Sequence, residues 1–213
     1  MALEASLSAK KPEVVFKGLV TPNFLTPRDR DLFTYLEAKL NLIAHNNKAA
    51  IPVLKDLVKS PNLLVQFQSQ LDLITAQPID LKQAIQKMEE LKFLWRGDMF
   101  EVNLLKQLAQ AYEQAKDNHK AILTYLTLQE YLSKFIDTQE NLTKVTNLVF
   151  EELQKFSPKE LLKKISFYYE FDEYLPTDER LLSLTAQIIP DLLTLKLNGR
   201  AIDILKKKID LLI

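Results

Sequence analysis

Residues 95–131 read WRGDMFEVNLLKQLAQAYEQAKDNHKAILTYLTLQEY and predict two helices joined by a tight turn. Gly97 can adopt the left-handed conformation that ends a helix, and Asp98 with Glu101 three residues later forms a capping box that starts the next helix. Apolar residues recur every three or four positions in both halves, so each helix is expected to bury one face. These faces consist of Val102, Leu105, Leu108, Ala109 and Tyr112, and of Ala121, Ile122, Tyr125, Leu128 and Leu132.

The order of small and large residues in this hairpin resembles a tetratricopeptide unit, in which small residues let two helices approach closely. The proline expected near the end of such a unit is replaced by Ser133. Small residues recur along the chain at Ala49, Ala84, Ala121 and Ala201, with Leu161 at the fourth place, in steps of 35, 37, 40 and 40 residues. Steps of nearly constant size are typical of stacked helix pairs.

Capping residues, prolines and glycines predict where the helices start and end. Proline behind a capping residue opens predicted helices at Thr26–Pro27, Ser60–Pro61 and Ser157–Pro158, and Asp80 and Thr177 are further predicted caps. Asn198–Gly199 is the predicted end of the helix before the last. We therefore expect an all-α fold, an α-solenoid of about five antiparallel hairpins in a right-handed, tetratricopeptide-like superhelix. Residues 1–25 form a lead-in segment, with a short helix over residues 2–9, and residues 26–213 form the repeat domain.

Composition narrows the classes of function. The 213 residues include 28 Lys and Arg and 28 Asp and Glu, so the formal net charge is zero and does not attract nucleic acid. Only three glycines and no cysteine are present, which favours helices and excludes disulfides and thiolate metal sites. The weakly charged stretch 181–197 is interrupted by Pro190 and Asp191, so no transmembrane segment is predicted.

Two passages resemble a family of alphaproteobacterial tetratricopeptide-like proteins of uncharacterised function. They are residues 94–112, with Trp95 and Gly97, and residues 168–205, with Tyr168–Phe171 and Leu175–Thr177. The resemblance extends over residues 85–213 and implies a helical-repeat fold with no catalytic residue to transfer. Family members are longer and many are exported. The compartment stays open. The residues that follow Met1 do not form a secretory signal, which predicts a cytoplasmic protein as the chain stands, and a piece of a longer exported protein would be periplasmic.

Candidate chemistry is sparse. His45 and His119 lie in polar turns without partners at ligand spacing, so no metal site is predicted. Nucleophile elbows, phosphate-binding loops and dinucleotide fingerprints are absent, so we expect no cofactor and no enzyme activity. An aromatic group at 167–174 has two readings. It either stacks on a ligand or forms core and a seam between repeats, and the second reading is favoured. Its members are Phe167, Tyr168, Tyr169, Phe171 and Tyr174.

The predicted binding residues are polar positions of the first helix of the central hairpin, on the side that faces the groove in tetratricopeptide geometry. They are Asn103, Lys106, Gln110, Glu113 and Gln114. We expect a noncatalytic scaffold that holds a protein or peptide partner in a concave groove. One alternative is a structural segment of a longer exported repeat protein, or self-association through the apolar C-terminal helix. Another is a helical domain of a peptidoglycan-processing enzyme, which requires an acidic pair in a cleft.

Overall fold

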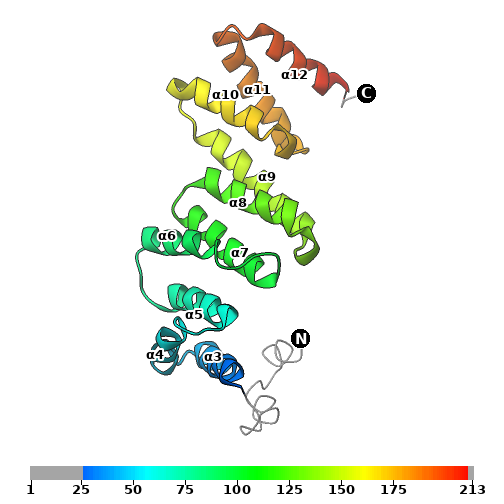
Figure 1. The fold of residues 1–213 in the computed structure, drawn as a ribbon. Coiled ribbons are helices and arrows are strands. Elements are labelled where there is room, and N and C mark those ends of the chain that lie inside the picture. Colours follow the sequence, from blue (N-terminus) through cyan, green and yellow to red (C-terminus); the bar gives the residue numbers. More distant parts are fainter. Residues whose placement is uncertain (1–25, 211–213) are drawn as a thin grey trace. The chain divides into compact units, whose positions relative to one another are not determined.

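The computed structural model describes residues 26–210, and this part of the chain is all-helical, without a strand (Figure 1). The expectation of an all-α protein is confirmed. The predicted lead-in segment, residues 1–25, and the last three residues lie outside the described range. The α-helices are α3 (Pro27–Ile43), α4 (Asn47–Leu57), α5 (Leu63–Ala76), α6 (Leu81–Leu91), α7 (Met99–Gln114), α8 (Asn118–Tyr131), α9 (Thr138–Lys155), α10 (Leu161–Glu170), α11 (Glu179–Thr194) and α12 (Asn198–Asp210). Three short 3-10 helices are η2 (Ser133–Phe135), η3 (Pro158–Glu160) and η4 (Asp172–Tyr174).

The chain divides into two compact units at residues 111 and 112, within α7. In unit 1, the consecutive helices α3, α4, α5 and α6 pack against each other in turn, and α3 also contacts α5. Unit 2 repeats this pattern through α8 to α12, where α9 also contacts α11. The extent of the repeat domain, residues 26–213, stays a prediction.

The two apolar stripes of the central hairpin are buried as predicted. The ten side chains named for α7 and α8 are each 5% exposed or less. On α4 the inward small residue is Ala50, which is fully buried, whereas Ala49 is exposed. Ala50 precedes Ala84 by 34 residues, so the spacing of small residues begins one position later than predicted.

Helix starts were predicted with mixed success. Thr26 and Ser157 are capping residues as predicted, and each forms a capping box with the acid three residues later, Asp29 and Glu160. The second box opens η3 rather than an α-helix. The Ser60–Pro61 cap is wrong. Asn62 caps α5, because the Ser60 hydroxyl donates a hydrogen bond to Asp31 of α3 and accepts one from the Asn62 N–H.

Two further caps differ from prediction. Asp178, not Thr177, caps α11 by accepting from the Arg180 N–H. Gly97 has φ 92° as expected, but the Glu101 carboxylate accepts from the Gly97 N–H, at 2.5 Å, whereas the predicted box requires the N–H of Asp98.

Three turns between helices share one backbone motif. His45, Lys116 and Lys196 have φ of 58°, 60° and 58°, in the left-handed region. In each turn the next N–H donates to the carbonyl five residues earlier, at 2.8, 2.9 and 2.8 Å, which defines a Schellman motif. An asparagine then begins the following helix. The predicted stop at Asn198–Gly199 is therefore wrong, because α11 ends at Thr194, with the left-handed Lys196 two residues later, and Gly199 lies in the first turn of α12.

A polar cluster lies inside unit 1. The Tyr35 hydroxyl donates to Asp72 Oδ2 at 2.9 Å and to Gln68 Oε1 at 3.2 Å, and Lys39 Nζ donates to Asp72 Oδ1 at 2.5 Å. Tyr35, Gln68 and Asp72 are buried. A buried carboxylate is stable only when its oxygens accept hydrogen bonds, so this cluster ties α3 to α5.

None of the described helices is both long and apolar enough to span a membrane.

Candidate functional site

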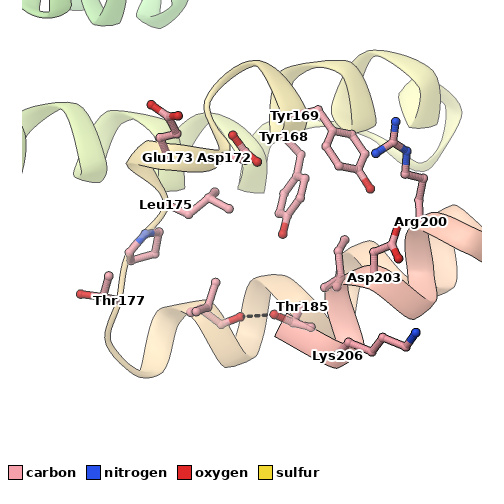
Figure 2. A pocket seen from close by; sticks show the side chains of 13 residues that line it. Tyr168, Tyr169, Asp172, Glu173, Leu175, Thr177, Thr185, Arg200, Asp203 and Lys206 are labelled. Atoms are coloured by element: carbon pink, nitrogen blue, oxygen red, sulfur yellow. Dashed lines mark hydrogen bonds between the residues drawn. The ribbon is translucent and has the colours of Figure 1, made fainter. Parts of the chain in front are cut away.

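Unit 2 contains an open cleft of about 600 Å³ formed by α10, η4, α11 and α12 (Figure 2). Local sequence explains its frame. Helix α10 ends at Glu170, η4 follows, and Pro176 lies in the link that leads to the Asp178 cap of α11. Helix α11 ends at Thr194, the left-handed Lys196 turns the chain, and α12 then forms the remaining wall of the cleft. The lining residues are Tyr168, Tyr169, Asp172, Glu173, Leu175, Pro176, Thr177, Leu181, Thr185, Arg200, Asp203, Ile204 and Lys206.

Two adjacent tyrosines dominate the cleft. Their rings meet edge to face, with centroids 5.3 Å apart and an interplanar angle of 88°. Tyr168 points into the cleft, and its hydroxyl has no hydrogen-bond partner among residues 26–210 (Figure 2). Burial, followed by the neighbouring Tyr169 and Asp172, raises the pKa of Tyr168 to about 12. The hydroxyl therefore keeps its proton at neutral pH and remains a donor.

The Tyr169 ring is covered by the cationic side chain of Arg200. The Arg200 guanidinium carbon lies 5.4 Å from the ring centroid, in the range of a cation–π contact. Burial raises the pKa of Tyr169, Arg200 opposes this shift, and Asp203 and Asp172 add to it. Its hydroxyl oxygen is buried and has no partner within the described part of the chain.

The charged side chains of the cleft are exposed and unpaired. Asp172 and Glu173 lie on η4, and Arg200, Asp203 and Lys206 lie one turn apart on α12. None of the five forms a hydrogen bond or an ion pair with another described residue. A contrasting pair lies nearby, where Lys164 Nζ of α10 is 2.7 Å from Asp191 Oδ2 of α11 and both side chains are largely covered. The cleft thus retains charges of both signs for an external group.

The aromatic group at 167–174 proves to be divided. Phe167 and Phe171 are buried, with centroids 4.8 Å apart, and Phe156 lies 5.7 Å from Phe167. These phenylalanines form core, whereas Tyr168 and Tyr169 line the cleft. Neither of the two readings of the sequence describes the whole group. Phe167 and Phe171 are four residues apart and lie on one helix face, whereas Tyr168 and Tyr169 lie on another.

The histidines have unequal surroundings. His45 is exposed in its left-handed turn, as expected. His119 lies in the first turn of α8, where Nε2 is 2.8 Å from Glu170 Oε1 and the ring meets Phe171 at 5.6 Å. Over the range 26–210, no group of three or more His, Asp or Glu side chains is arranged to hold a metal ion.

The predicted binding residues all lie on α7. Four are exposed and lack hydrogen bonds to the described residues: Asn103, Lys106, Gln110 and Gln114. Glu113 is half-buried and accepts a hydrogen bond from the Tyr125 hydroxyl at 2.6 Å. Burial and this hydrogen bond raise the pKa of Tyr125. Glu113 therefore has a role in holding α8 to the end of α7.

The charged residues of the cleft were missed by sequence reasoning. Arg200, Asp203 and Lys206 recur every three residues, which marks one face of α12. This spacing is equally typical of a solvated face, so the sequence alone does not distinguish the two. Asp172 and Glu173 have no local signal, since only packing of α10 on α11 and α12 brings them to the cleft.

No protein-family model matches the chain, and no curated protein and no solved structure matches it either. Function is therefore inferred from the residues of the chain itself.

Proposed function

We propose that the protein is a noncatalytic scaffold that binds a segment of a partner protein, built as a tetratricopeptide-like solenoid of about five antiparallel hairpins. Two observations support the repeat. In each unit, neighbouring helices pack together and one first helix contacts the next first helix. The turns at His45, Lys116 and Lys196 have the same geometry. Right-handedness and a concave face are part of the proposal, as is the resemblance to the alphaproteobacterial family.

The observation that carries the binding role is the row on α7. Asn103, Lys106, Gln110 and Gln114 are spaced by three, four and four residues, so they follow one face of the helix. All four are exposed with free donors and acceptors, whereas the opposite face is closed by apolar side chains. Lys144 on α9, by contrast, forms an ion pair with Glu140 of its own helix. A free polar row on a rigid helix can bind a polypeptide segment through side-chain hydrogen bonds.

A pull-down with Lys106→Glu plus Gln110→Ala tests the groove. We expect loss of the partners recovered with the wild type, and about a tenfold or larger rise in Kd for a purified partner. Lys82→Glu plus Gln83→Ala on α6 is the matched control, because both residues are also exposed on a helix. Equal recovery by all three proteins would sink the groove assignment.

Absence of catalysis is part of the same proposal. The cleft of unit 2 does hold three carboxylates, so a peptidoglycan-processing role meets its first requirement. Asp172, Glu173 and Asp203 are exposed, however, whereas a general acid of a glycosidase usually lies in apolar surroundings. Incubation of the protein with purified peptidoglycan should release no soluble fragments. Their release, and its loss in a Glu173→Gln variant, would overturn the noncatalytic assignment.

A second candidate function is assembly through the last hairpin. Ile202 and Leu205 of α12 are 50% and 44% exposed, and Leu193 at the end of α11 is 51% exposed. Exposed aliphatic groups of this kind favour contact with a second copy. Light scattering should show mass above 24.6 kDa at high concentration, and Ile202→Lys plus Leu205→Lys should restore the monomer. A wild type that stays monomeric removes this candidate.

A further inference from the structure

We infer that the cleft of unit 2 is a binding site for an extended peptide segment in which an apolar side chain lies between a basic and an acidic side chain. The inference shares with the proposed function only the premise that the ligand is a polypeptide segment. It uses a different surface, since the α7 row contributes no residue to the cleft.

The middle of the cleft is apolar. Leu175, Pro176, Leu181 and Ile204 line the cleft together with the Tyr168 ring. A volume of about 600 Å³ is in the range of clefts that bind small ligands. Burial of one leucine-sized side chain there would contribute roughly 1.5 to 3 kcal/mol. The apolar centre therefore selects an aliphatic anchor.

The two sides of the cleft differ in charge. Asp172 and Glu173 lie at one side, and Arg200 and Lys206 with Asp203 lie on α12 at the other (Figure 2). The sides carry two negative charges and a net single positive charge, and they do not pair with each other. A basic ligand group is attracted to η4 and an acidic group to α12. Polyanions such as nucleic acid are disfavoured, because phosphates would meet Asp172 and Glu173.

Hydrogen bonding favours a polypeptide over other ligands with charges of both signs. The Tyr168 hydroxyl is a protonated donor without a partner in the described chain, and it points into the middle of the cleft. An extended peptide presents carbonyl acceptors along its length, one of which this donor can bind. The guanidinium of Arg200 has the fork of donors that suits a carboxylate. An extended backbone also turns alternate side chains to one side, so the three recognised side chains are expected two residues apart.

The probes for a test are acetyl-Lys-Ala-Leu-Ala-Glu-amide and the same peptide in reverse order, since the cleft does not fix the direction of the chain. Each is titrated into the ¹⁵N-labelled full-length protein. We expect one of them to shift the amide signals of residues 168–176 and 200–206 in a saturable way. Replacing its leucine by alanine should weaken binding about tenfold or more, and 0.5 M salt should weaken it further.

Charge reversal gives the sharper result. The wild type should bind the mixed peptide more tightly than a peptide with glutamate at both ends. In the variant Asp172→Lys plus Glu173→Lys, the peptide with two glutamates should bind more tightly, which reverses the wild-type order. Glu151→Lys on α9 is the matched control, because Glu151 is exposed and away from the cleft, and it should keep that order. Circular dichroism checks the helix content of each variant, and Arg200→Glu repeats the test from α12 if the double variant unfolds.

Two outcomes overturn the inference: no saturable shift with either mixed peptide, or a wild-type order that survives charge reversal on both sides. Failure of the proposed function is separable. Lys106→Glu plus Gln110→Ala should leave peptide binding to the cleft unchanged. If neither peptide binds the cleft and that variant still loses its cellular partners, the scaffold proposal is supported and the cleft proposal is wrong. If a peptide binds the cleft and the variant keeps its partners, the cleft proposal is supported and the α7 groove is wrong.

Discussion

The polar cluster of unit 1 and the cleft of unit 2 use the same kinds of residue in opposite ways. In unit 1, Asp72 is buried and both of its oxygens accept hydrogen bonds, from Tyr35 and Lys39. In unit 2, Asp172 and Arg200 are exposed near two tyrosines, and no described residue forms a hydrogen bond or an ion pair with either of them. The difference teaches that pairing and burial together mark a structural cluster, whereas free charges around a partly apolar cleft mark a surface that can bind.

The largest expected effect is the difference in stability lost when one acid is removed from each region. Asp72→Ala leaves the buried Tyr35 hydroxyl with only its longer hydrogen bond, to Gln68, and leaves Lys39 without its partner, so the free energy of unfolding should fall by about 2 to 4 kcal/mol. Asp172→Ala removes an exposed, unpaired group and should change it by less than about 0.5 kcal/mol.

Urea denaturation measures both variants. Circular dichroism follows all helices, and fluorescence of Trp95, the single tryptophan, follows unit 1. Equal effects of the two substitutions would break the distinction between a structural cluster and an open site.

An intermediate effect is expected from alkaline pH. Burial, and then Asp72, raise the pKa of Tyr35 above its ordinary value near 10. Above pH 10 the unfolded chain loses this proton while the folded chain keeps it, so stability falls as pH rises. One such group contributes a loss of about 1 kcal/mol between pH 10 and 11.

Tyr35→Phe should therefore give a shallower decline of unfolding free energy above pH 10. Tyr168→Phe should have the same direction and a nearly equal effect up to about pH 11, and a smaller effect only near pH 12 and above, where the folded chain also loses the Tyr168 proton. If the unfolding free energy declined equally in the wild type and in Tyr35→Phe, the Tyr35 hydroxyl would be open to solvent. The contrast between a buried cluster in unit 1 and an open cleft in unit 2 would then be wrong.

The smallest effect concerns a feature that the two regions share. His45 in unit 1 and Lys196 in unit 2 are non-glycine residues with positive φ. Left-handed backbone costs an ordinary residue about 1 to 2 kcal/mol, and glycine loses about 0.5 to 1 kcal/mol in unfolded-state entropy. His45→Gly and Lys196→Gly should each raise the free energy of unfolding by about 0.5 to 1 kcal/mol.

Thermal denaturation compares these variants with His45→Ala and Lys196→Ala, which keep the strain. Lys196→Gly should also leave peptide binding to the cleft unchanged, because Lys196 does not line it. Destabilisation by glycine in one unit alone would mean that the turns are not equivalent repeats.

Sequence patterns predicted the helices well where the signal was local. The caps at Thr26 and Ser157 and the left-handed Gly97 depend on residues within four positions of each other. Ser60 failed because its hydroxyl bonds to Asp31, 29 residues away. The predicted stop at Gly199 is wrong because Lys196, and not the glycine, adopts the left-handed conformation.

The sequence by itself determined the all-helical class, the positions of most helices and the buried stripes of α7 and α8, because periodicity and capping act over one or two turns. Only the tertiary structure decided that Tyr168 and Tyr169 line a cleft while Phe167 and Phe171 form core, and that Glu113 bonds to Tyr125. It also decided which charged side chains have no hydrogen bond or ion pair within the described chain. Each of these outcomes depends on contacts between different helices, and helical spacing in the sequence does not distinguish a polar residue that makes such a contact from one that faces solvent.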